Sequence, residues 1–138
     1  MELKDNWFGL DGIDNGLPFL IRGRENLNNF RETKSYKIRI DICWTYNSTD
    51  ISLMPGEEDL DLMNRVEDLL VQNLEIDLLA ILSFVYTGNN QKVWYWYSQN
   101  TEKTVERINS VLMKFEELPI KLFSAFDPEW EEYNNILD

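Results

Sequence analysis

The chain has 138 residues, no histidine, one cysteine and a formal net charge of −12 at pH 7. This length suits one domain that buries about 70% of its unfolded surface, and an apolar fraction of 43% with 13% aromatic residues is too high for a disordered chain. The negative charge disfavours nucleic acid and anionic membranes as ligands. Without histidine, the commonest general base and transition-metal ligand is missing.

We therefore expect one domain, residues 1–138, with no metal site, no cofactor and no catalytic residues of a recognisable type. The first ten residues lack a basic segment followed by an apolar one, as a secretory signal would have, and no apolar run approaches the roughly 20 residues that a membrane span needs. Cys43 has no second cysteine to pair with, which fits a reducing compartment. These features predict a cytoplasmic protein that does not bind membranes.

Two strands are predicted in the first third of the chain. The segment 17–24 (LPFLIRGR) is typical of a short strand, entered through the turn-rich residues 11–16, and the polar, Asn-rich segment 25–35 predicts a loop. In the segment 36–46 (YKIRIDICWTY), apolar and polar side chains alternate throughout. This period of two predicts a long strand with one apolar face.

The period changes after residue 50. Apolar residues recur at helical spacing from Leu62 to Leu74, which predicts an amphipathic helix over 56–75. Pro55 precedes this helix, and Glu57, Glu58 and Asp59 occupy its first turn. Carboxylates there interact favourably with the positive end of the helix dipole, so this acidic group indicates a helix start rather than a metal site.

The rest of the chain predicts a hairpin, a helix, a strand and a short helix. The hairpin joins 78–87 to 91–98 through a Gly-Asn turn, the helix covers 101–116, the strand covers 119–126, and the last helix begins at Asp127-Pro128. This order predicts an α+β fold: a ferredoxin-like βαββαβ core with an extra N-terminal strand. We expect the strand order 119–126, 36–46, 91–98, 78–87, with two helices on one face and a short C-terminal helix.

The strand 91–98 contains the aromatic run VWYWY, in which Trp94 and Trp96 point away from Tyr95 and Tyr97. If both long helices cover one face, two large rings remain on the other. The terminal segments can cover them, or they can anchor a protein partner or a second copy of the chain. We therefore include Trp94 and Trp96 among the candidate partner-binding residues.

The net negative charge lies entirely in residues 47–138, and the last twelve residues contain no lysine or arginine. Glu129, Glu131 and Glu132 complete the candidate partner-binding set, and a partner that meets them would present a basic surface. Asp127, Trp130 and Tyr133 form a candidate structural motif, because Asp127 can cap the last helix and the other two lie on one side of it.

Four segments together resemble the bacterial domain of unknown function 695 family: MPGEEDL at 54–60, VEDLL at 66–70, TGNNQKVWYWY at 87–97 and DPEWEEY at 127–133. The resemblance implies a ferredoxin-like α+β fold, similar in architecture to regulators of ribonuclease E activity, which are acidic inhibitors that bind protein. It implies no catalytic residue. We expect a non-catalytic, inhibitor-type or immunity-type protein that binds a basic protein partner. The alternative is a carboxylate-dependent enzyme or a small-ligand-binding domain, which a pocket with convergent polar groups would favour.

Overall fold

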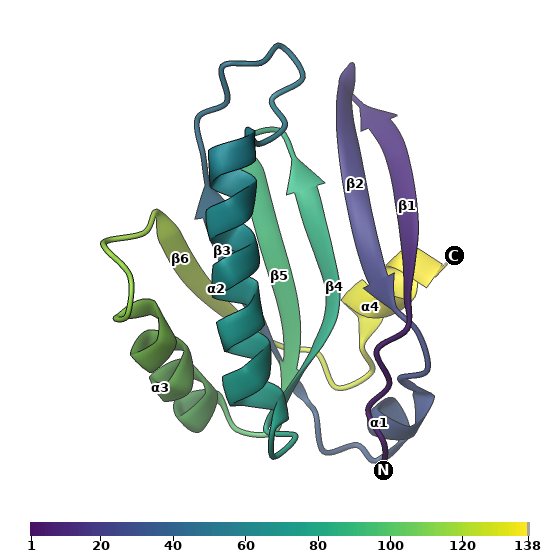
Figure 1. Ribbon diagram of the computed structural model, residues 1–138. Helices are drawn as coiled ribbons and strands as arrows, with labels where there is room; N and C mark the ends of the chain where they lie inside the picture. Colours follow the sequence, from purple (N-terminus) through teal and green to yellow (C-terminus); the bar gives the residue numbers. More distant parts are fainter. Residues whose placement is uncertain (138) are drawn as a thin grey trace.

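The computed structural model describes residues 1–137. The protein is built around a single antiparallel sheet (Figure 1). The strands are β1 (Trp7–Asp14), β2 (Leu17–Arg24), β3 (Ile38–Thr45), β4 (Ala80–Gly88), β5 (Gln91–Ser98) and β6 (Ile120–Phe126), in the spatial order β1-β2-β4-β5-β3-β6. The helices are α1 (Asn28–Glu32), α2 (Glu57–Glu75), α3 (Thr101–Leu112) and α4 (Glu131–Leu137). The predicted α+β class is confirmed. Asp138, the last residue of the acidic C-terminal segment, lies outside the described residues.

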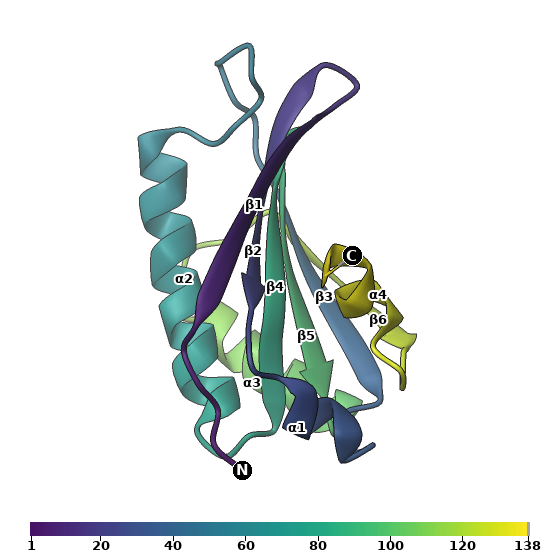
Figure 2. The same ribbon diagram turned by 90° about the vertical axis from the view of Figure 1, so that its right-hand side faces the viewer.

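The larger core lies between the sheet and the helices α2 and α3. One side of the central strands contributes Ile40, Ile42, Leu82, Trp94 and Trp96, all fully buried. They meet the apolar stripe of α2 and the buried face of α3. Figure 2 shows the sheet nearly edge-on, with α2 on one side and α4 on the other.

A second core lies on the opposite face of the sheet. Phe30 of α1 and Tyr133 of α4 pack there with Ile81, Phe84 and Tyr97 of the central strands. Because successive side chains of a strand point to opposite faces, β5 contributes tryptophans to one core and tyrosines to the other. The sheet is therefore covered on both faces near its centre.

Local signals explain where the long helices begin and end. Three carboxylates occupy the first turn of α2, although Gly56, its N-cap, supplies no side-chain cap. In α3 the Asn100 side chain accepts a hydrogen bond from the amide of Lys103 at 2.9 Å. The helix α3 stops at Leu112, short of the predicted residue 116, because the amides of Lys114 and Phe115 bond to carbonyls three residues back and tighten the last turn.

The N-terminal region differs most from the prediction. Residues 7–14 form β1, which pairs with β2 through an Asn15-Gly16 turn with positive φ at both residues, 52° and 80°. The ring of Phe8 lies over Gly23, where an added Cβ would come within 2.2 Å of it. The predicted loop 25–35 contains α1, whose Phe30 is fully buried.

The strand order therefore differs from that of a four-stranded ferredoxin-like sheet. The strands β4, β5, β3 and β6 are neighbours in that order, but the hairpin β1–β2 extends the sheet beyond β4. The sheet consequently has β1 at one edge and β6 at the other. No helix among residues 1–137 is both long enough and apolar enough to cross a lipid bilayer.

We predict slow amide exchange in β3, because this strand is hydrogen-bonded on both sides, to β5 and to β6. In hydrogen–deuterium exchange, the amides of residues 40–44 should be among the slowest of the molecule, and those of the edge strand β1 should exchange faster. Protection of β1 with fast exchange in β3 would contradict this topology.

Candidate functional site

The two tryptophans predicted to face a partner lie instead inside the larger core. Trp94 and Trp96 are both 0% exposed. The indole nitrogen of Trp94 donates to Glu67 of α2 at 2.7 Å, and its ring meets Trp44 edge-on. Sequence alone did not predict this burial. The alternation in β5 shows that the two tryptophans share a face, but it does not show that α2 and α3 cover that face.

The predicted structural motif joins the C-terminus to the opposite face. Asp127, Trp130 and Tyr133 are 6%, 1% and 4% exposed. The Trp130 ring stacks on Tyr97 with centroids 4.1 Å apart, and its indole nitrogen donates to the carbonyl of Tyr36 at 2.8 Å. The Tyr133 hydroxyl donates to the carbonyl of Arg24. These contacts hold the C-terminal segment against β5, the end of β2 and the chain just before β3.

Asp127 connects three parts of this region. Its two carboxylate oxygens accept the amides of Glu131 and Glu132, at 2.8 and 3.3 Å, and so cap α4. The Tyr97 hydroxyl donates to the same carboxylate at 2.7 Å. Burial, reinforced by this hydrogen bond and by the charge of Asp127, raises the pKa of Tyr97 far above its usual value, so Tyr97 remains a hydrogen-bond donor at any physiological pH.

The three candidate acidic residues of the C-terminal segment differ in their surroundings. Glu129 forms an exposed ion pair with Lys34 at 3.2 Å, and a carboxylate oxygen of Glu132 lies 3.7 Å from the Arg39 guanidinium. Glu131 is exposed and makes no ion pair within residues 1–137. Glu131 is therefore the acidic side chain of α4 that is most available to a basic partner.

The strand β6 carries two exposed phenylalanines, one on each face of the sheet. Phe123 is 55% exposed and Phe126 is 73% exposed. Phe123 pairs with Asp41 of β3, so it lies on the α4 side of the sheet, whereas Phe126 pairs with Ile38 and lies on the α2–α3 side. Their odd and even positions in the predicted strand 119–126 already place them on opposite faces, but only the structure shows them to be exposed.

Asp41, the residue of β3 that pairs with Phe123, and Glu132 both contact the Arg39 guanidinium. Arg39, next to Asp41 on β3, donates to both oxygens of that carboxylate, at 2.8 and 3.2 Å, and also lies within 3.7 Å of Glu132. Burial, together with the charges of Asp41 and Glu132, raises the pKa of Tyr95 to about 12. We call the surface formed by Phe123, Phe126, Glu129, Glu131 and Glu132 the β6 edge.

The neighbouring strand β3 places the Cys43 thiol opposite Lys121 of β6. Cys43 of β3 is half-buried, and burial with the nearby charge of Asp41 raises the pKa of its thiol, which keeps it protonated. Within residues 1–137, no group of three or more Cys, Asp or Glu side chains is arranged to hold a metal ion. What the edge offers is apolar area, carboxylates and the free backbone groups of an edge strand.

Comparison with known proteins gives one match. Residues 5–137 match the model of DUF695, a family of unknown function. No curated protein and no solved structure matches the chain.

Replacing Trp130 with alanine should lower the free energy of unfolding by about 3–5 kcal/mol, because a fully buried ring with two aromatic neighbours would leave a cavity. Chemical denaturation measures this loss, and Trp7→Ala, at a half-buried ring, serves as the comparison. Unchanged stability of the Trp130→Ala protein would show that the motif does not hold α4 in place.

Proposed function

The chain belongs to DUF695, a family of unknown function, and we propose from its structure that it is a non-catalytic binding and regulatory protein of the inhibitor or immunity type. Its partner is a protein with a basic, extended segment, and that segment lies along the β6 edge. The observation that carries this proposal is the pair of exposed phenylalanines on an edge strand, with Glu132 of α4 lying 3.7 Å from Arg39 on the neighbouring strand β3.

An edge strand supports this proposal because its outer backbone groups are free to pair with an added strand. Phe123 and Phe126 lie on opposite faces, so an added strand would cover apolar area on both sides of the sheet. Burying one phenylalanine side chain contributes about 1.5–3 kcal/mol. Two such anchors supply a substantial part of the affinity of a short segment.

The other edge strand is less suited to this role. Although β1 exposes Leu10 and Ile13, it contains Asp11 and Asp14 and two glycines, which weaken strand pairing. The strand β6 contains no glycine, and Lys121 is its only charged residue. Natural edges are protected by charge, bulges or covering segments, and β6 has little of this protection.

The charge distribution favours a basic partner. Several basic side chains are not available to a partner. Arg24 and Lys92 are buried, and Arg22, Arg39 and Arg107 form ion pairs within the chain. Most acidic side chains are exposed. A second copy of the chain, also with a charge of −12, would be repelled by this field, whereas a basic segment would be attracted and would associate faster.

We also propose that β3, α2, β4, β5, α3 and β6 form a ferredoxin-like unit to which the β1–β2 hairpin is added. The antiparallel pairing of β4 with β5, of β5 with β3 and of β3 with β6 supports this assignment. In such a unit the last strand lies at an edge, which is the place that the proposed function requires.

A short fluorescent peptide in which lysine alternates with valine tests the function. We expect saturable binding in fluorescence anisotropy, and no binding of the same peptide with glutamate in place of lysine. The variant Phe123→Ser/Phe126→Ser should bind at least about tenfold more weakly, because it removes both apolar anchors. The control variant Ile13→Ser changes an equally exposed residue on the opposite edge and should bind normally.

The charge is tested with Glu129→Gln/Glu131→Gln/Glu132→Gln, compared with Glu57→Gln/Glu58→Gln/Asp59→Asn at the start of α2. Only the first should slow association, and rising salt should reduce this difference, since the Debye length falls from about 10 Å at 0.1 M to about 3 Å at 1 M. Wild-type binding by the phenylalanine variant would refute the proposal. A dimer in ultracentrifugation that the same variant abolishes would assign the β6 edge to a second copy instead.

A further inference from the structure

The backbone hydrogen bonds at the two ends of β6 show which of its residues are free to pair with an added strand. The amide of Asp127 donates to the carbonyl of Lys37 at 2.8 Å, and the amide of Thr45 donates to the carbonyl of Pro119 at 3.1 Å. In an antiparallel pair, residues that bond to the neighbouring strand alternate with residues whose backbone groups point away from it. The odd-numbered residues of β6 therefore bond to β3, and the even-numbered ones point their backbone groups outward.

Leu122, Ser124 and Phe126 thus carry the free backbone groups of this edge. Within residues 1–137, none of their amides donates to a turn or a loop, whereas the amide of Ile120 donates to the carbonyl of Leu118 at 2.8 Å. An antiparallel added strand would exchange hydrogen bonds with these three residues. Its bonding residues would then lie with their side chains on the α2–α3 side of the sheet.

The two faces of β6 differ in chemistry. On the α2–α3 side the strand presents the apolar side chains of Leu122 and Phe126, and on the α4 side Lys121 and Ala125 flank Phe123. Because side chains on the same face of neighbouring strands contact one another, apolar residues of an added strand match the first face. Charged residues have partners only on the second.

An excess of negative charge lies one strand in from Ala125. Ala125 pairs with Arg39 of β3. The Arg39 guanidinium lies 2.8, 3.5 and 3.7 Å from carboxylate oxygens of Asp41, Asp127 and Glu132, and no other basic side chain among residues 1–137 pairs with these carboxylates. One guanidinium cannot balance three carboxylates, and the Glu132 side chain is 46% exposed. The cluster can therefore accept a second cation.

This cluster is accessible from the edge because Ala125 is small. Neighbouring strands lie about 4.8 Å apart, and a lysine or arginine on an added strand can extend its stem over the alanine methyl group toward the carboxylates. Lys121 lies four residues earlier on the same face, is exposed and makes no ion pair within residues 1–137. The α4 side of β6 thus offers negative charge near one end and positive charge near the other.

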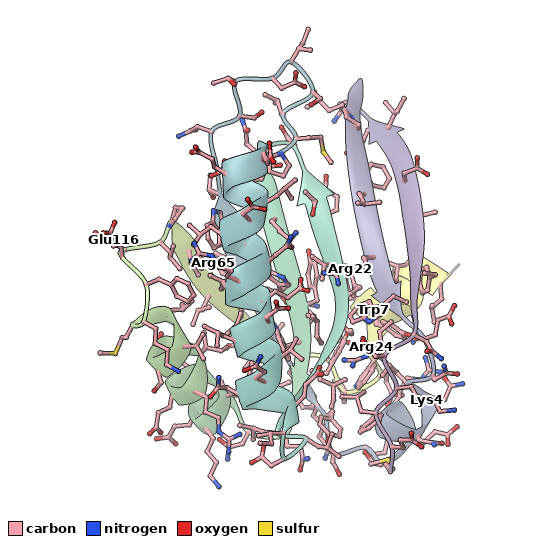
Figure 3. All side chains as sticks on the ribbon, viewed as in Figure 1. Lys4, Trp7, Arg22, Arg24, Arg65 and Glu116 are labelled. Carbon is pink, nitrogen blue, oxygen red and sulfur yellow. The ribbon has the colours of Figure 1, made fainter. Side chains whose placement is uncertain are left out.

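Other basic groups of the chain are already paired, in contrast to Lys121. Figure 3 shows Arg22 and Arg24 close together beside α2. A groove of about 320 Å³, which we call the charged groove, lies there between α2 and the β1–β2 hairpin. Arg22 pairs with Glu67 at 2.5 Å, and Arg24 pairs with Glu75 at 2.7 Å.

We propose that the partner segment adds to β6 in the antiparallel direction, with a lysine or arginine opposite Ala125 and an acidic residue opposite Lys121, four positions later in the segment. Apolar residues alternate with these positions and face the α2–α3 side. This inference rests on the proposed function and specifies the partner of the same site. Antiparallel addition continues the pairing of the whole sheet and is slightly more stable per residue than parallel addition.

Two fluorescent peptides of identical composition test the inference: Lys-Val-Lys-Val-Thr-Val-Glu-Val-Lys and its reversal, Lys-Val-Glu-Val-Thr-Val-Lys-Val-Lys. With threonine opposite Phe123, an antiparallel strand of the first places lysine opposite Ala125 and glutamate opposite Lys121. The reversal exchanges both charge pairs for repulsive ones, and each exposed pair is worth a factor of about 1.4 to 5 in affinity. In fluorescence anisotropy at low salt, the first peptide should bind at least about threefold more tightly.

The variant Lys121→Glu should remove most of this preference, because it removes the cation that distinguishes the two ends of the strand. The control variant Lys4→Glu makes the same change of charge at an exposed residue far from β6, labelled in Figure 3, and should keep the preference. A full preference in the Lys121→Glu protein would overturn the inference.

Methylation of backbone nitrogens in the first peptide tests its direction and register. Methyl groups on the two central valines remove the donors that reach Ser124 and Leu122, and should weaken binding at least about tenfold. Methyl groups on the threonine and the glutamate, whose amides point away from β6, should change the affinity by no more than about twofold. The opposite pattern would assign a parallel strand and overturn the inference.

Equal affinity of the two peptides, or tighter binding of the reversal, would also overturn the inference. If the Phe123→Ser/Phe126→Ser variant then still weakened both peptides, the proposed function would stand without it. Binding of neither peptide to the wild-type protein would overturn both.

Discussion

The structure depends on the aromatic residues of β5, which are large on both faces of the strand. Trp94 and Trp96 point to one side, and Tyr95 and Tyr97 point to the other. Such rings bury 150–250 Å² each, so neither face can be left to water. One face is covered by α2 and α3, and the other by α1 and α4. A sheet with only two helices on one side would leave the tyrosine face exposed.

The helix α4, which covers part of the second face, carries two acidic residues of the proposed partner site, Glu131 and Glu132. The C-terminal helix is held by Trp130 stacked on Tyr97 and by Asp127, which bonds both to Tyr97 and to the start of α4. These contacts place Glu132 of α4 3.7 Å from Arg39 on β3, the strand that pairs with β6. The buried motif therefore supports the proposed binding surface and is not part of that surface.

The exposed phenylalanines and the charged groove of the molecule lie where this coverage ends. At one side, α4 does not cover Phe123, and Phe126 is exposed on the opposite face of β6. At the other side, α2 does not extend over the β1–β2 hairpin, and the space between them contains Arg22 and Glu67. The proposed partner site thus lies beyond the limits of the helices that protect the aromatic centre of the sheet.

Most elements could be predicted because their signals are local. The alternation of β3, the apolar stripe of α2 and the Asn100 cap of α3 each lie within a few residues. The strand β1 was missed because its glycines and aspartates are unfavourable in strands, although Asn15-Gly16 is a strong hairpin turn. The burial of Trp94 and the exposure of Phe123 depend on which helix covers which face, and no local pattern records that.

The central claim is that a basic segment adds to β6, and amide exchange tests it most directly. Exchange is measured for the protein alone and with the alternating lysine–valine peptide at saturation. The account predicts slower exchange at residues 120–126, whose outer amides would gain hydrogen bonds, with no change in β1. Protection confined to β1, or to the start of α2, with unchanged exchange in β6 would contradict it.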